Sequence, residues 1–308
     1  MKAFLKYSIT LIISIFLVWY LVKHWNELKS LLDISLTKLI FLYVISAVGT
    51  LIGGISSMVL IKSLGTKTRF WDMVILQNAI FLLNYAPMKL GTIFRANYLK
   101  KHYGLSFARF GTFFMYLTFI MTFTAPATGT VALLAVYSVK KWEIQVLLFS
   151  FIASLIISFI FLFIPVPLPK GQNKLSTILR NFLHGRNDVI KNKKTLLYCA
   201  ALMNINFILT AVRLAIIYYS LGQNVNPAGF LILGAVGYCL MFASITPGAI
   251  GIRELVLGAA SVAIGVPLKV GIPAAIIDRA ISITYSFIIG GICTIYLWRK
   301  CPEDFKKD

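Results

Sequence analysis

Acidic side chains are scarce in this chain. Its 308 residues include only ten aspartates and glutamates against 30 lysines and arginines, and charged residues make up 13% of the sequence. A soluble globular domain carries about 25% charged residues, whereas hydrophobic residues alone reach 59% here. The composition therefore excludes an ordinary soluble protein and indicates a chain that lies largely within a membrane.

Histidine and cysteine are also rare. The chain has three histidines and four cysteines, and no two cysteines form a CxxC pair. Metal sites and disulfide frameworks need clusters of these residues, so we expect no metal and no cofactor. The sequence also lacks a glycine-rich phosphate loop, an HExxH helix, a nucleophile elbow and a pair of catalytic carboxylates. We therefore do not expect an enzyme.

Long apolar segments dominate what is present. A transmembrane helix needs about 20 apolar residues, and six segments meet this need: 4–22, 39–61, 108–137, 142–164, 196–220 and 271–298. Two further apolar stretches, 70–103 and 228–266, have proline and glycine near the middle, where a helix would break. Each half of these two stretches is shorter than the roughly 20 residues that a transmembrane helix needs. The expected fold is an all-α polytopic membrane protein with about six transmembrane helices and two re-entrant helical hairpins.

The distribution of basic residues predicts the topology. With the N-terminus inside and only the six long segments crossing, 19 lysines and arginines fall on the inner side and six on the outer side. This excess obeys the positive-inside rule. It predicts that both termini are cytoplasmic and that the chain lies in the plasma membrane. The basic loops then contact anionic headgroups, and we do not expect nucleic acid as a partner.

The two broken stretches are similar to each other. Both tips read P-x-x-[LI]-G, and an arginine follows each, at an offset of 160 residues. The tip residues of interest are Pro87, Gly91, Pro247, Gly248 and Gly251. The sequence YGLS at 103–106 also matches IGVP at 264–267, at an offset of 161 residues. Landmarks that recur at nearly one offset indicate an internal repeat.

The repeat unit is a span, a hairpin and a span. Residues 39–137 and 196–298 are predicted to be two such units of opposite orientation, and inverted repeats with broken helices are an architecture of transporters. The rest of this single membrane domain is a first span with an amphipathic connector, a span with a basic linker, and a basic tail, at residues 1–38, 138–195 and 299–308.

Charged residues within the apolar segments are mostly arginines. Five bases and two acids occur there: Lys89, Arg95, Arg213, Arg253, Arg279, Glu254 and Asp278. Each charge at membrane depth costs about 2.5–3.5 kcal/mol on insertion scales, and the bases exceed the acids by three. Such an excess suits a phosphate ligand, which the guanidinium fork binds through two hydrogen bonds.

Several alternatives stay open for these charges. Arg253 or Arg279 could instead pair with an acid and hold a hairpin against a helix. Lys89 and Arg95 could lie at the level of the cytoplasmic headgroups. The two acids, Glu254 and Asp278, are either counter-charges or proton sites, because acids at membrane depth often exchange protons.

Helical spacing places uncharged polar residues beside these charges. Three polar stripes occur: Asn206, Thr210 and Arg213; Arg279, Ser282 and Ser286; Gln77 and Asn84. Within each stripe the residues recur at three-, four- or seven-residue intervals, which puts them on one helix face. Such faces turn toward the bundle rather than toward lipid. We expect them to line a shared polar cavity.

Two blocks of the sequence resemble a known family. PGAIGIREL, followed by GVP and a helix with an arginine, and APMKLGTIFRANYLKKHYGLS are similar to blocks of the lysylphosphatidylglycerol synthase transmembrane-region family, also called flippase-like domain proteins. The resemblance extends over about residues 39–298. It implies that Arg95, Arg253, Glu254 and Arg279 are polar cavity residues. It also implies movement of anionic or modified phospholipids, or of polyprenyl-phosphate carriers, between leaflets.

The chain departs from this family in two places. Thr92 follows the first tip glycine where an acid is common, so the first tip lacks the acid–base pair of the second. Only RKCPEDFKKD follows the last expected span, in place of the soluble aminoacyl-transferase domain of the bifunctional members. We therefore do not expect this chain to aminoacylate lipids.

Two classes of function follow from the sequence. The first is a translocator that moves an anionic phospholipid or a polyprenyl-phosphate-linked lipid between leaflets, with the phosphate near Arg253 and Arg279. The alternative is a membrane subunit or enzyme of lipid-linked glycan or lipid-modification synthesis. Its partner would be a separate synthase or glycosyltransferase. A homo-oligomer is compatible with either function.

Overall fold

The computed structural model describes residues 34–85, 90–138, 140–164, 189–243 and 252–300, together with residues 180, 183, 186 and 187; for 241–243 it describes the backbone alone. Several predicted features lie outside these residues. They are the span at 4–22, the basic tail, and five residues of the hairpin tips, namely Pro87, Lys89, Pro247, Gly248 and Gly251.

Five helical runs in the described part of the chain are long and apolar enough to cross a membrane. They are α3 (Leu36–Ser63), α6 (Phe107–Val136), α7 (Trp142–Phe163), α9 (Lys193–Ser220) and a continuous run of α12 (Leu268–Tyr285), the π-helix η3 (Ser286–Gly290) and α13 (Gly291–Lys300). These runs coincide with five of the six predicted spans, which are thereby confirmed. The chain is an all-α polytopic membrane protein.

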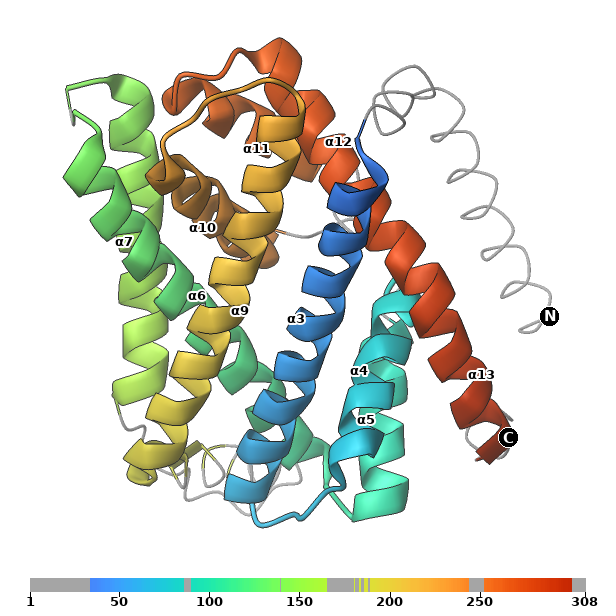
Figure 1. The fold of residues 1–308 in the computed structure, drawn as a ribbon. Helices are drawn as coiled ribbons and strands as arrows, with labels where there is room; N and C mark the ends of the chain where they lie inside the picture. The colour runs from blue at the N-terminus through green and yellow to red at the C-terminus, as the bar shows by residue number, and fades with distance from the viewer. Residues whose placement is uncertain are drawn as a thin grey trace, which may run out of the picture.

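Two pairs of shorter helices occupy the predicted hairpins. They are α4 (Phe70–Leu83) with α5 (Leu90–Tyr103), and α10 (Pro227–Ala243) with α11 (Ile252–Ala263). Helices of 12 to 17 residues reach about 18–25 Å at 1.5 Å per residue, which is short of a hydrocarbon core of about 30 Å. In Figure 1, the first pair opens at the lower end of the bundle and the second pair at the upper end.

The two sets of helices share their turn landmarks. Gly65 and Gly222 follow the first long helix of each set, with φ of 84° and 73°, and Gly104 and Gly265 follow the second hairpin leg, with φ of 68° and 90°. Glycine adopts this left-handed conformation without the penalty that a Cβ brings. Since α3 runs downward and α9 upward in Figure 1, matching elements have opposite directions, as inverted repeats require.

Each hairpin packs into a hydrophobic cluster of its own. The first cluster includes Leu60, Met73 and Phe113, and packs α4 and α5 against α3 and α6. The second includes Phe230 and Leu257, and packs α10 and α11 against α9 and α12 and against α6 and α7. Polar residues can therefore lie between the clusters without disturbing the close packing inside either one.

The repeats are interleaved rather than placed side by side. Helix α9 packs against α3, α10 against α6, and η3 with α13 against α4. At the last of these contacts, a Cβ added to Gly290 would lie 2.7 Å from the carbonyl oxygen of Asn78. Each repeat thus covers part of the other.

The two legs of the first hairpin approach closely at Gly91. A Cβ added there would lie 2.5 Å from the carbonyl oxygen of Ile80 and 2.6 Å from Asn84 Oδ1. Because the carbonyl cannot rotate away, we expect Gly91→Ala to force α4 and α5 apart and to lower the free energy of unfolding by about 1–3 kcal/mol. Thermal unfolding of the purified protein in detergent measures this loss.

The control for that experiment is Gly291→Ala. Nothing lies within 4 Å of a Cβ added to Gly291, and alanine favours a helix over glycine by about 0.8–1.0 kcal/mol. Gly291→Ala should therefore leave the unfolding temperature unchanged or raise it. An equal loss in the two variants would contradict the close contact at Gly91.

Candidate functional site

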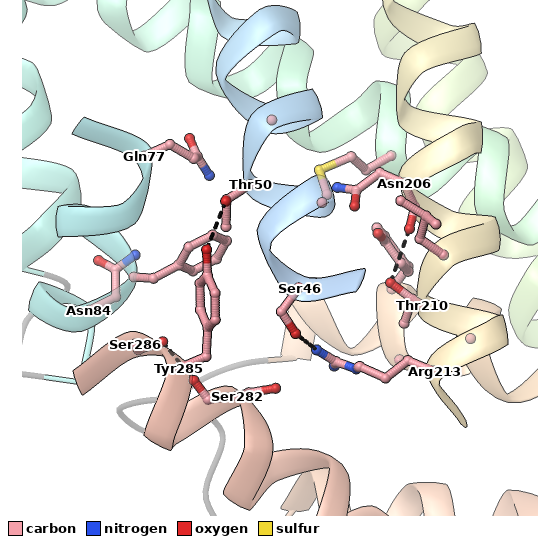
Figure 2. Close-up of a pocket in the computed structure, with 18 of the residues that line it drawn as sticks. Ser46, Thr50, Gln77, Asn84, Asn206, Thr210, Arg213, Ser282, Tyr285 and Ser286 are labelled. Atoms are coloured by element: carbon pink, nitrogen blue, oxygen red, sulfur yellow. Dashed lines mark hydrogen bonds between the residues drawn. The ribbon is translucent and has the colours of Figure 1, made fainter. Parts of the chain in front are cut away.

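A cavity of about 450 Å³ lies among the two hairpins and the long helices α3, α6, α9 and α12. This volume is typical of a small-molecule site. Its described lining includes three arginines, Arg95, Arg213 and Arg253, and no acid. Figure 2 shows Arg213 pointing into it from α9. The wall also has an apolar part, to which α6 contributes Phe114 and Leu117.

Two of these arginines share one carboxylate. Arg213 Nη2 lies 2.8 Å from Asp278 Oδ1, and Arg253 Nη2 lies 2.9 Å from Asp278 Oδ2. Asp278 is fully buried, whereas the side chain of Arg253 is 28% exposed and that of Arg213 13% exposed. One carboxylate cannot neutralise two guanidinium groups, so the cavity wall keeps a net positive charge here.

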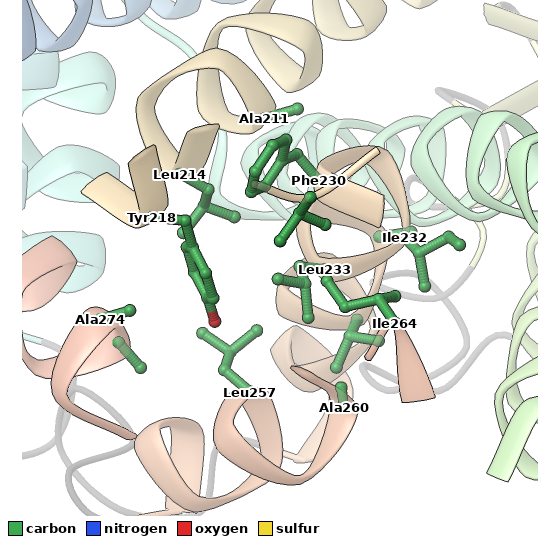
Figure 3. Close-up of a cluster of buried hydrophobic side chains, with 14 of the residues drawn as sticks. Ala211, Leu214, Tyr218, Phe230, Ile232, Leu233, Leu257, Ala260, Ile264 and Ala274 are labelled. Carbon is green, nitrogen blue, oxygen red and sulfur yellow. The ribbon is translucent and has the colours of Figure 1, made fainter. Parts of the chain in front are cut away.

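Packing fixes the helix that carries Arg253. Leu257 lies one turn further along α11 and belongs to the second hydrophobic cluster, where Figure 3 shows it close to Tyr218 and Leu233. Ala260 and Ala263 of α11 belong to the same cluster, so this helix is anchored along its length. The guanidinium of Arg253 is thereby held at the cavity.

Arg279 forms a separate ion pair. Its Nη1 lies 2.7 Å from Glu254 Oε1, and the two side chains are 4% and 5% exposed. Neither residue is part of the described cavity lining. This pair joins α11 to α12, which is the stapling role that the sequence left open for Arg279. Arg279 therefore holds two helices together and does not belong to the described wall of the cavity.

Arg95 lies in the cavity wall rather than at the surface of the bundle. It is 4% exposed, its Nη2 donates to Ser57 Oγ at 2.6 Å, and its guanidinium carbon lies 4.6 Å from the centroid of the Phe113 ring. Within the described residues it has no carboxylate partner, and its Nε has no acceptor. A buried guanidinium without a counter-charge is costly, so an anion in the cavity would stabilise it.

Uncharged polar groups form another part of the wall. Tyr285 Oη donates to Asn78 Oδ1 at 3.0 Å and lies 3.1 Å from Thr50 Oγ1. Figure 2 shows Gln77 and Asn84 across the cavity from α9. The four uncharged cavity residues that the sequence predicts all line this cavity: Asn84, Asn206, Thr210 and Ser282.

A comparison with protein families identifies the chain. The family model described as the lysylphosphatidylglycerol synthase TM region matches residues 7–290. The chain belongs to this family. No curated protein and no solved structure in the comparisons matches it. As a lysylphosphatidylglycerol synthase TM-region protein, it is an integral membrane protein of a lipid-related, flippase-like family.

In this TM-region protein, sequence reasoning missed the polar face of α3. Ser46, Thr50, Gly53 and Ser57 follow one another at spacings of four, three and four residues, which puts them on one helix face. Ser46 Oγ accepts from Arg213 Nη1 at 3.3 Å, and Ser57 accepts from Arg95. The helical spacing of these residues within the predicted span 39–61 is the signal that could have revealed this face.

The cavity of this TM-region protein is suited to binding an anion. Its arginines come from α5, α9 and α11, so both repeats contribute positive charge to it. Among the described residues, no three histidine, cysteine or acidic residues lie close enough to hold a metal ion. The polar groups that the described wall offers to a ligand are guanidinium groups, amides and hydroxyls.

Proposed function

We propose that this protein is a lipid translocator, which moves an anionic phospholipid or a polyprenyl-phosphate-linked lipid between the membrane leaflets. One observation carries the proposal: three guanidinium groups converge on one cavity whose described wall has no acid. Guanidinium binds phosphate through paired, charge-assisted hydrogen bonds. The phosphate of the headgroup would lie among Arg95, Arg213 and Arg253 while the acyl or prenyl chains stay in the bilayer.

The origin of the arginines supports movement rather than static binding. Arg95 is on α5 of the first hairpin and Arg253 on α11 of the second, and these hairpins open at opposite ends of the bundle. A phosphate between them contacts an element from each repeat. Inverted repeats that move against each other can open such a site to one face and then to the other.

The orientation in the membrane is part of the proposal. Lys62 lies in the last turn of α3, Lys67 and Arg69 follow this helix, and Lys100 and Lys101 lie in the last turn of α5, all at the end where the first hairpin opens. By the positive-inside rule this end faces the cytoplasm. The first hairpin would then receive lipid from the inner leaflet of the plasma membrane, and the second from the outer leaflet.

A vesicle assay tests translocation. The purified chain is reconstituted into vesicles that hold a trace of phosphatidylglycerol or polyprenyl phosphate with a fluorophore on its chain, and dithionite quenches the outer leaflet. We expect dithionite to quench more fluorescence than the labelled lipid of the outer leaflet accounts for. The rate of this further quenching should rise with the number of protein copies per vesicle. Vesicles without protein, and vesicles with heat-unfolded protein, serve as controls.

Other outcomes of this assay point elsewhere. If no phosphate lipid crosses faster than in the control vesicles, the chain is not a translocator of these lipids. Chemical conversion of the labelled lipid would instead support an enzyme. Conversion that begins only after a synthase or glycosyltransferase is added would support a membrane subunit.

A further inference from the structure

The cavity is built by elements that are poor in acids. Helices α3 to α6 and α9 to α13 contain three carboxylates, Asp72, Glu254 and Asp278. Asp278 and Glu254 are in ion pairs, and Asp72 accepts from Tyr103 and Lys300 away from the cavity lining. Residues 86–89 and 244–251, which connect the legs of the two hairpins in sequence, read APMK and SITPGAIG and contain no acid.

Two amide oxygens in the cavity wall lack a donor. Gln77 Oε1 and Asn84 Oδ1 are both buried and have no hydrogen-bond partner within the described residues. Both belong to the cavity lining, and Figure 2 shows them on the side formed by α4, with Asn84 near Ser286 and Tyr285 and with Gln77 toward Thr50. Buried polar atoms are nearly always satisfied in folded proteins, so these oxygens indicate that a ligand brings donors to this side.

Charge decides which donors a ligand can bring. Hydroxyl and ammonium groups can both donate to an amide oxygen. An ammonium group, however, would enter a cavity with three guanidinium groups on its described wall, of which the buried Asp278 offsets one. Like charges repel strongly where water is scarce. A hydroxyl has no such penalty, and it can also accept from the amide nitrogen of the same side chain.

We propose that the cavity selects a phosphate ester whose remaining headgroup is neutral and bears hydroxyl groups, and that it rejects headgroups bearing an ammonium group. The phosphate lies at the arginines and the hydroxylated part at Gln77 and Asn84. This inference rests on the proposed function only in taking a lipid phosphate as the occupant. Glycerol and sugar headgroups share the required chemistry.

Binding of short-chain lipids to the purified full-length protein in detergent tests the selectivity without requiring transport. The probes are dihexanoyl phosphatidylglycerol, which has hydroxyls, phosphatidylethanolamine, which has an ammonium, and phosphatidylmethanol, which has neither. Thermal-shift titrations report the affinities, because a ligand that binds only the folded state raises its stability. We expect phosphatidylglycerol to bind about tenfold or more tightly than phosphatidylethanolamine, and more tightly than phosphatidylmethanol. A short-chain polyprenyl-phosphate hexose, titrated alongside, shows whether glycerol or sugar is preferred.

A single isosteric variant tests the location. Gln77→Glu places a carboxylate in the cavity wall, so it should weaken binding of phosphatidylglycerol and narrow its preference over phosphatidylethanolamine by about tenfold. Gln145→Glu makes the same change on the exposed surface of α7 and should leave the preference unchanged.

Each outcome bears on a stated part of the inference. Equal binding of phosphatidylglycerol and phosphatidylethanolamine overturns the rejection of ammonium, and equal binding of phosphatidylglycerol and phosphatidylmethanol overturns the role of hydroxyls. If Gln77→Glu keeps the wild-type preference for phosphatidylglycerol over phosphatidylethanolamine, the headgroup does not lie at Gln77. Selective binding without movement of lipid in vesicles supports this inference and overturns translocation alone, whereas binding of none of the four lipids overturns the inference.

Discussion

Replacing Asp278 with alanine is expected to destabilise the protein by about 3–5 kcal/mol, because removal of one partner from a buried ion pair leaves the other charge uncompensated. Here a single carboxylate serves two guanidinium groups, at 2.8 Å and 2.9 Å. Arg253 is exposed enough to turn toward the cavity after the substitution, but Arg213 is 13% exposed and cannot reach water as easily. Thermal unfolding in detergent measures the loss.

Two further variants show whether the loss comes from the stranded charge. In Asp278→Asn combined with Arg213→Gln, the carboxylate and its more buried partner are both neutral, so much of the stability should return. Glu143→Ala removes an acid in the first turn of α7 and should cost less than about 1 kcal/mol. If Asp278→Ala and Glu143→Ala have equal effects, the ion pairs of Asp278 do not stabilise the fold.

Replacing Arg253 with alanine should nearly abolish lipid movement while the protein stays folded. Hydrogen bonds to charged groups contribute about 1.5–3 kcal/mol, so loss of the phosphate contact should slow translocation by about 10- to 100-fold. Stability should change little, because Asp278 keeps Arg213 as a partner. The dithionite assay in vesicles gives the rate, and thermal unfolding confirms the fold.

Lysine and a distant arginine provide the controls. Arg253→Lys keeps the charge but loses the planar fork that matches phosphate, so its rate should fall between those of the wild type and Arg253→Ala. Arg109→Ala removes an exposed arginine in the first turn of α6 and should translocate at the wild-type rate. A full rate for Arg253→Ala, with the fold intact, would remove this residue from the phosphate site.

The spans and hairpins could be predicted because their signals are local. Apolar length alone locates α7, and the proline and glycine at each tip locate the breaks. The pairing of charges could not be predicted in this way. Arg213 and Asp278 are far apart in sequence, and their contact depends on how α9 packs against α12. From the sequence alone, either Glu254 or Asp278 could pair with Arg253 or with Arg279, and only the packing of α11 against α12 decides which pairs form.

Part of the cavity lining could be predicted from the sequence, and part could not. The stripe of Asn206, Thr210 and Arg213 has helical spacing and indicates an interior face, and the structure places it on the cavity wall. Tyr285 gave no such signal, because a tyrosine in an apolar helix is equally typical of a membrane interface. Its role as a link between Asn78 and Thr50 is a tertiary contact between separate helices.

The interleaving of the repeats makes each one depend on the other for its packing. Helix α10 covers α6, and α13 covers α4, so each hairpin also packs against a helix of the other repeat. A protein made of one such unit would leave apolar and polar faces open within the membrane, where an unsatisfied polar group is costly. A single unit of this kind would therefore need a second copy of opposite orientation beside it to cover these faces.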